Sequence, residues 1–156
     1  MGISLSLEQY LDGRGVPYDV TTHEHTLCSS ATAHASSIPE DNLAKGVLVR
    51  CDDGYLLAVV PASRHVQMEA LANWLQKPIE LATETEASMI FGDCELGSVP
   101  PVAGAYGLMA VIDDNLKDFD DIYFEGGDHR TLVHVTGQNF QWLMADVPHA
   151  HISKHG

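Results

Sequence analysis

The sequence is poor in cations. Eight Lys and Arg residues stand against 22 Asp and Glu, which gives a formal net charge of −14 at pH 7. A protein that follows a nucleic-acid backbone over a long footprint normally carries a basic patch, and this chain has few cations to make one. Contact with RNA would therefore be local, at one end of the molecule, unless a partner supplies the charge. The alternative is that the acidity only aids solubility.

Cysteine is also scarce. The chain has three, at Cys28, Cys51 and Cys94, without CxxC spacing. This count supports neither a disulfide framework nor a zinc site and favours reduced thiols in the cytosol. No apolar stretch approaches the roughly 20 residues that span a bilayer, and the first residues do not read as a signal peptide. We therefore expect a cytoplasmic protein without membrane contact.

Several catalytic motifs are missing. The sequence has no HExxH, P-loop, GxGxxG or GxSxG, which argues against a serine hydrolase of the α/β type. In a strand, His23 and His25 would share a face and could meet one metal ion. No third and fourth ligands follow at a telling spacing, so surface histidines are the better account. We predict no metal and no other cofactor.

The 156 residues fit one domain, which we take to span 1–156. Strands come in hairpins with helices between them, which indicates an α+β domain around a mixed, partly closed sheet. Helices are expected over 4–13, 29–36, 67–75, 83–89 and 139–145, and strands over 18–22, 44–51, 55–61, 79–82, 108–113, 122–125 and 131–135.

Local signals sharpen some of these boundaries. Ser6 is expected to cap the first helix with Gln9 as its capping-box partner, and Thr83 is expected to cap a later helix with Glu86. The run Asp52-Asp53-Gly54 predicts a hairpin turn. The polar tail from residue 148 onward is expected to fray.

Lys45 stands at the start of an apolar strand, where a lysine is expensive to bury. A partly buried ammonium can bind a phosphate or carboxylate, or polarise an ester carbonyl. The alternative is an exposed lysine that marks a sheet edge, and spacing alone favours that alternative.

Two Gly-rich segments are further candidates. In the loop over 97–104, the backbone N–H groups of Gly97, Ser98 or Val99 could bind an oxyanion or an ester carbonyl. In the run over 125–130, two glycines place Asp128 and His129 at a strand end, where the histidine could act as acid or base. A structural turn and a polar hairpin tip are the respective alternatives, and the pattern does not choose.

Cys28 could act as a nucleophile. No His/Asn arrangement supports that role, and a small buried hydrophobe is the commoner one.

The chain carries, in order, a lysine in AKGVLV, the strand YLLAVVPA, then LATETE, GSVPP, VIDDNL and YFEGG. This ordered set resembles the YbaK/prolyl-tRNA-synthetase-associated domain family over nearly the whole chain. The resemblance implies an α+β fold with a mixed, barrel-like β-sheet and flanking helices. It also implies an editing domain or free-standing deacylase that cleaves the ester of mischarged aminoacyl-tRNA and so supports translation fidelity.

The same resemblance implies a set of site residues. Lys45 matches the family's strand lysine and would anchor the terminal phosphate or polarise the ester, while the loop donors would hold the carbonyl or the amino group. Water, or a group of the substrate itself, would attack. The implied catalytic set is Lys45, Gly97, Ser98 and Val99, and the implied substrate-binding set is Cys28, Ser30, Thr32, Pro101, Gly104, Asp128 and His129.

The implied partner is the acceptor end of an aminoacyl-tRNA, with transient contact to a synthetase as a further option and no DNA. The acidic balance motivates a rival interpretation, because a fold alone does not fix function. In that interpretation the chain is a non-catalytic binding module of the same fold for an aminoacyl or nucleotide ligand or a protein partner.

Overall fold

Two mostly apolar segments, 43–49 and 55–62, form the centre of the fold. The computed structural model describes residues 3–26, 28–52, 54–95 and 99–155. Its helices are α1 Leu5–Gly13, α2 Ser29–Ala35, α3 Met68–Leu75, α4 Glu84–Ile90 and α5 Gly137–Leu143, with 3-10 turns η1 Glu40–Asn42, η2 Ala103–Tyr106 and η3 Asp114–Leu116. Its strands are β1 Asp19–Thr22, β2 Ala44–Cys51, β3 Gly54–Pro61, β4 Arg64–Val66, β5 Ile79–Leu81, β6 Met109–Asp113, β7 Asp121–Glu125, β8 Thr131–Thr136, β9 His149–Ala150 and β10 Ser153–His155.

The central sheet has the order β5-β2-β3-β6-β9. The antiparallel hairpin of β2 and β3 sets Lys45 opposite Val60 and Leu48 opposite Leu57, while β6 pairs with β3 in parallel. From Leu56 onward β3 is buried, as expected of a strand covered on both faces. The predicted hairpin and the mixed character of the sheet are confirmed.

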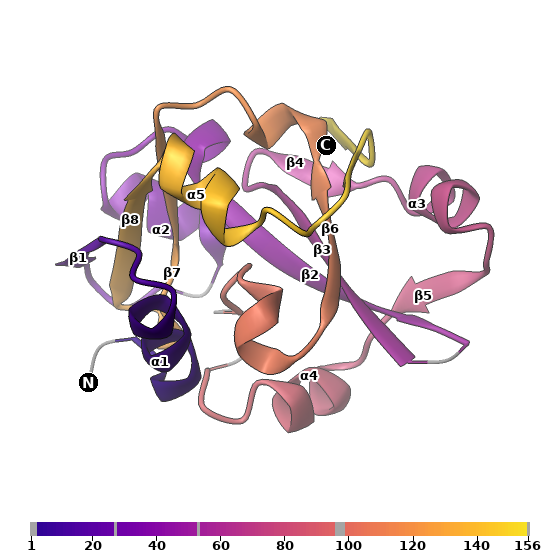
Figure 1. Ribbon diagram of the computed structural model, residues 1–156, viewed down its shortest axis with the longest axis horizontal. Helices are drawn as coiled ribbons and strands as arrows, with labels where there is room; N and C mark the ends of the chain where they lie inside the picture. The colour runs from indigo at the N-terminus through magenta and orange to yellow at the C-terminus, as the bar shows by residue number, and fades with distance from the viewer. Residues whose placement is uncertain (1–2, 27, 53, 96–98, 156) are drawn as a thin grey trace.

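A second sheet, β1-β8-β7, is antiparallel. A parallel bridge between Leu43 and Tyr123 joins its edge to the residue that precedes β2. In Figure 1 this sheet lies with α2 on the left, and β2, β3 and β6 cross the middle. The expected α+β class is confirmed, but the described strands divide into three sheets and do not close into a barrel.

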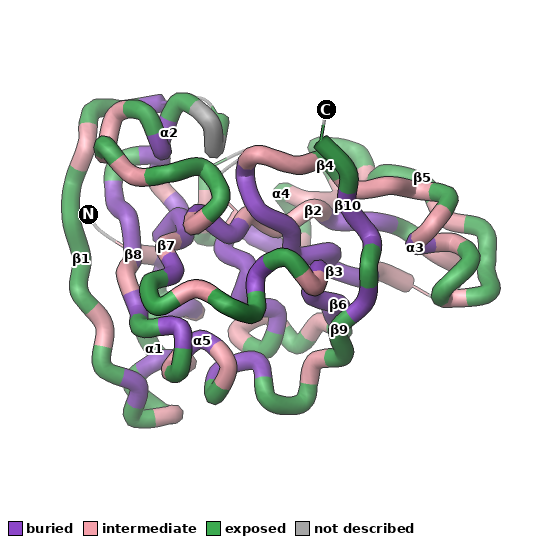
Figure 2. The backbone as a smooth tube through the Cα atoms, turned by 90° about the horizontal axis from the view of Figure 1, so that it is seen from above, coloured by how far each residue is buried: buried purple, intermediate pink, exposed green. Residues whose placement is uncertain are grey.

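Helices cover the outer surfaces and seal the core. Figure 2 shows the buried segments along β2, β3, β6, β7 and β8, with exposed chain at the periphery. The largest apolar cluster joins α1, α5 and both larger sheets through residues such as Leu7, Phe124 and Phe140. No helix of the described chain is both long enough and apolar enough to cross a membrane.

Two local predictions are wrong. Ser4, not Ser6, caps α1, and its hydroxyl accepts from the Leu7 amide. The Ser4 amide also donates to the carbonyl of Gly126, which fixes this residue as the start of the helix. The tail does not fray, because β9 pairs with β6 and β10 pairs with β4.

Candidate functional site

Lys45 is half-buried at the head of β2. Burial lowers the pKa of its ammonium below the ordinary 10.5, while the negative charge of Glu40 acts in the opposite direction. The structure therefore gives Lys45 a partly desolvated setting, unlike the exposed edge lysine that spacing alone favoured.

The predicted pocket wall at α2 divides into an outer and an inner part. Cys28 precedes the helix and is exposed, so it is not the buried hydrophobe that was expected. Thr32 is fully buried, and its hydroxyl donates to Glu125 Oε2 over 2.9 Å. The side chain of Ser30 lies outside the described residues. Thr32 therefore supports the predicted wall from the inside, through its hydrogen bond to Glu125.

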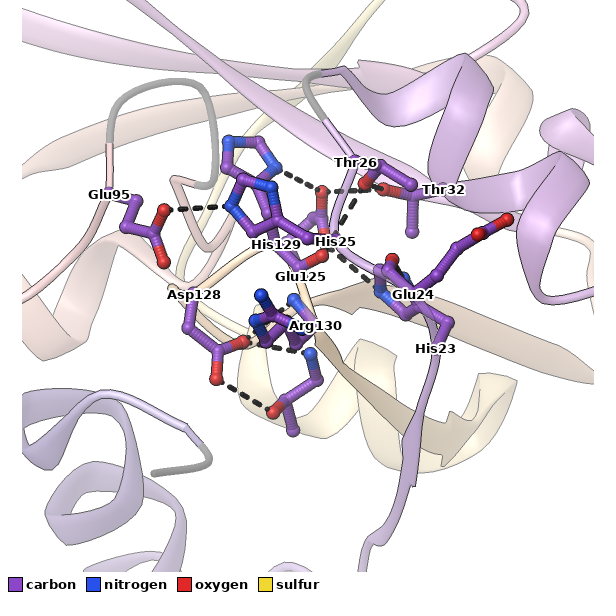
Figure 3. A network of polar contacts seen from close by, with 11 residues as sticks. His23, Glu24, His25, Thr26, Thr32, Glu95, Glu125, Asp128, His129 and Arg130 are labelled. Atoms are coloured by element: carbon purple, nitrogen blue, oxygen red, sulfur yellow. Dashed lines mark hydrogen bonds and ion pairs between the residues drawn. The ribbon is translucent and has the colours of Figure 1, made fainter.

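Glu125 stands at the centre of a buried polar cluster, which we call the Glu125 cluster: His23, Thr26, Thr32, Glu125 and His129 (Figure 3). Glu125 Oε2 lies 3.3 Å from His129 Nδ1, and Oε1 lies 3.8 Å from His23 Nε2. The side chains of all three residues are no more than 3% exposed. Burial raises the pKa of the Glu125 carboxyl, and the hydroxyl of Thr32 and the two histidines oppose that shift.

The backbone aims His129 into this cluster. Its φ of 57° is in the left-handed region, which a residue other than glycine adopts only where its surroundings enforce it. The Thr26 amide donates to the His129 carbonyl over 3.2 Å. Asp128 Oδ1 accepts from the amides of Arg130 and Thr131. These bonds hold the turn, so Asp128 shapes the site around His129.

His25 connects the buried cluster to the surface. Its ring meets the edge of the His129 ring, with centroids 5.7 Å apart. Its Nε2 lies 3.0 Å from Glu95 Oε1, and both side chains are partly exposed. The Glu95 amide in turn donates to the carbonyl of Gly127. The fold thus brings the start of the Gly/Pro-rich loop beside the His129 turn, although about 30 residues separate them in sequence.

The structure describes part of this loop. Gly97 and Ser98 lie outside the described residues, so their predicted role as donors stays a prediction. Val99 is half-buried and packs against the main apolar cluster, and Pro101 is buried. Gly104 lines an apolar cavity of about 320 Å³, whose lining includes neither Lys45 nor His129. A side chain at Gly104 would collide with the hydroxyl of Tyr10, which accounts for the glycine by packing.

Sequence reasoning missed Glu125 and His25 as members of the site. The i+4 spacing from Glu125 to His129 and the two-residue spacing from His23 to His25 were the available signals. Among the described residues, no group of three or more His, Cys, Asp and Glu side chains is arranged to hold a metal ion. His23 and His25 have different partners, since His23 faces Glu125 and His25 faces Glu95.

A model of the aminoacyl-tRNA editing domain family matches residues 23–143. The chain belongs to this family. The matched range begins at the first histidine of the buried cluster and ends at the last residue of α5, so it includes Lys45, Glu125 and His129. No curated protein sequence matches the chain.

Solved structures share the fold of this editing domain. A protein described as hypothetical protein APE2540 superposes with a TM-score of 0.84 at 21% identity, over 96% of this chain and 99% of that one. A candidate trans-editing enzyme for prolyl tRNA synthetase gives 0.82 at 21% identity, over 96% and 95%. A candidate signal transduction protein from Marinobacter aquaeolei VT8 gives 0.77 at 17% identity, over 96% of this chain and 30% of that one. At such identities these likenesses show the fold alone.

Proposed function

We propose that this editing-domain protein is an aminoacyl-tRNA deacylase that hydrolyses the ester of a mischarged tRNA. The observation that carries the proposal is the half-buried Lys45 at the head of β2. Partial burial of a lysine costs free energy, and this chain has only eight Lys and Arg residues. We therefore infer that the charge of Lys45 is used.

The proposed reaction needs no nucleophile from the protein. The oxygen of a water forms a bond to the ester carbonyl carbon, the bond from that carbon to the ribose oxygen breaks, and the ribose oxygen takes up a proton. The products are the free amino acid and uncharged tRNA. Lys45 anchors the terminal phosphate or polarises the carbonyl, and the loop amides of Gly97, Ser98 and Val99 hold the carbonyl or the amino group. The catalysis is positioning and electrostatic stabilisation.

The acidic charge of the chain restricts how the RNA is held. A net charge of −14 repels a long stretch of phosphate backbone, whereas one half-buried lysine can receive a single phosphate. We therefore place the contact at the acceptor end, with the rest of the tRNA outside the domain.

A deacylation panel tests the proposal. Mischarged tRNAs carrying alanine, cysteine or serine are incubated with wild type, Lys45→Ala and the control Lys117→Ala, and release of the amino acid is followed. Mischarged tRNAPro comes first, because one structure of this fold is described as a candidate editing enzyme for prolyl tRNA synthetase. Lys117 is exposed beside η3, so its loss removes the same charge away from the site.

We expect Lys45→Ala to lower the rate by about 100-fold or more and Lys117→Ala to leave it within about twofold. If no member of the panel is hydrolysed at high protein concentration, the proposal is wrong. Binding of a non-hydrolysable aminoacyl-adenosine analogue without turnover of any ester would favour the binding-module interpretation instead.

A further inference from the structure

Among the described residues two carboxylates are buried, Asp113 and Glu125, and their contacts differ. Asp113 accepts hydrogen bonds from the backbone amides of Asn115 and Ile152, so it terminates β6 and fastens the tail. The carboxylate of Glu125 instead meets side chains: Thr32 from α2, His23 after β1 and His129 after β7. A carboxylate that accepts hydrogen bonds from backbone amides stabilises the fold, whereas a carboxylate that contacts two imidazole rings holds those rings in position.

The distances identify the ring nitrogen that Glu125 engages. Its Oε2 faces Nδ1 of His129 at 3.3 Å. A carboxylate beside Nδ1 favours the tautomer with the hydrogen on that atom, which leaves the lone pair on Nε2 across the ring. Thr32 donates to the same oxygen and is held in turn by the Thr26 hydroxyl, so the carboxylate has little freedom to turn away.

We propose that Glu125 is a positioning residue, which holds the His129 ring in one tautomer and orientation at the inner wall of the site. The inference rests on the proposed deacylation. In that reaction Nε2 of His129 would orient the attacking water or the substrate's hydroxyl, directly or through the adjoining His25 ring. The strained backbone of His129 serves the same end, because it turns the imidazole toward Glu125.

A positioning carboxylate in this place costs stability. Burial raises the pKa of Glu125, so the folded protein holds that proton more tightly than the unfolded chain does. The stability linked to Glu125 is therefore full below the ordinary carboxyl pKa and is lost as the pH rises through the raised value. The groups that face the carboxylate are His23, His129 and Thr32, with His25 and Glu95 beyond His129.

The test separates this role from a structural one. Glu125→Gln keeps the shape and an acceptor for Thr32 but removes the charge, and Glu125→Asp keeps the charge. Glu69→Gln, exposed on α3, is the matched control. For each variant we would measure kcat and KM for deacylation over pH 5–9, the melting temperature at pH 7.5, and the tautomer of His129 from its ring ¹⁵N shifts.

Glu125→Gln is expected to lower kcat by about tenfold or more with KM nearly unchanged, and to shift the acid limb of the pH profile. Its melting temperature at pH 7.5 should equal or exceed that of wild type. Glu125→Asp should recover part of kcat, and Glu69→Gln should match wild type.

Parallel losses of kcat and melting temperature in Glu125→Gln would overturn the inference in favour of a structural role. An unchanged His129 tautomer in that variant would overturn it as well. The ¹⁵N measurement needs no substrate. If wild type hydrolyses no ester, the proposed function fails while the tautomer still reports whether Glu125 holds the ring.

Discussion

Two buried regions of this editing domain follow opposite rules. Around the β2–β3–β6 sheet, residues such as Leu57, Val59 and Ile112 are fully buried in an apolar cluster. Between α2 and β7, the Glu125 cluster brings a carboxylate, two imidazoles and two hydroxyls out of water. The first region gains free energy from every apolar contact. The second gains it only where each polar group finds a partner.

The difference shows where stability and geometry come from. Apolar packing is non-directional, so it stabilises the sheet without fixing any single side chain for chemistry. The Glu125 cluster is directional, and it holds His129 beside a loop and a helix that also border the proposed site. We therefore expect substitutions in the first region to change stability, and substitutions in or near the second to change activity.

The largest effect should come from a hole in the apolar region. Leu57 is fully buried opposite Leu48, and Leu57→Ala should lower the free energy of unfolding by about 2–5 kcal/mol. Leu81→Ala, at a residue 59% exposed, should cost less than about 0.5 kcal/mol. Urea unfolding measures both. Equal losses in the two variants would contradict the central place given to the sheet.

Next comes removal of the charge at Lys45. Lys45→Met keeps the apolar stem, and it should reduce deacylation by about 100-fold without lowering the melting temperature at pH 7.

Burial lowers the pKa of Lys45, so the wild-type stability linked to this group should rise as the pH climbs through that lowered value toward 10.5. The variant should lack that rise, and thermal melts across the alkaline range would detect it. A large fall in stability at pH 7 would instead make Lys45 a structural residue.

A smaller effect is expected inside the Glu125 cluster. Thr32→Val keeps the volume but removes the hydroxyl that donates to Glu125, at a cost of about 1–3 kcal/mol. It should also lower kcat, because the carboxylate gains freedom to leave His129. Thr21→Val on the exposed strand β1 is the matched control and should be nearly neutral in both chemical denaturation and turnover. Unchanged turnover in Thr32→Val would uncouple this hydroxyl from the site.

The smallest effect concerns a helix end in neither region. The Thr83 hydroxyl accepts from the Glu86 amide while the Glu86 carboxylate accepts from the Thr83 amide. Thr83→Ala should cost about 1 kcal/mol.

The backbone hydrogen bond from Thr83, followed by the Tyr55 hydroxyl, lowers the pKa of Glu86 from 4.5 to about 2. The stability linked to Glu86 is therefore present above pH 4.5 and lost as the pH falls through about 2. Melting curves of wild type and Thr83→Ala at pH 7 and pH 3 measure this contribution. Identical curves at both pH values would show that the capping box does not stabilise the protein.

Local chemistry made part of this fold predictable. The bounds of β2 are those expected from its apolar run, and the capping box at Thr83 forms as its spacing predicts. The cap of α1 was missed because the choice of Ser4 over Ser6 depends on Gly126 and on the Tyr106 hydroxyl, both more than 100 residues away. The pairing of β10 with β4 was missed for the same reason, since a polar run carries no signal for a distant partner.

The candidate site divides along the same line. Lys45 and His129 were singled out as candidates at strand ends, and the family resemblance placed them in the predicted site. The Glu125 partnership was not found, because Thr32 lies 93 residues before it and no spacing rule connects them. The sequence placed Gly104 in the substrate-binding set, yet its contact with Tyr10 gives that glycine a packing role. Pairwise contacts across the fold decide which motif residues meet.

The order of strands in the central sheet also bears on how the chain folds. Hairpin β2–β3 closes over a short turn, but β6 and β9, which complete the sheet, come from residues 109–113 and 149–150. Contacts of such long separation delay folding, typically to milliseconds or longer for two-state domains. During synthesis the hairpin can form early, while the outer edge of β6 stays uncovered until residues 149–150 emerge. A ribosome stalled shortly before β9 would thus present an unpaired strand edge, the feature that chaperones and aggregating chains recognise.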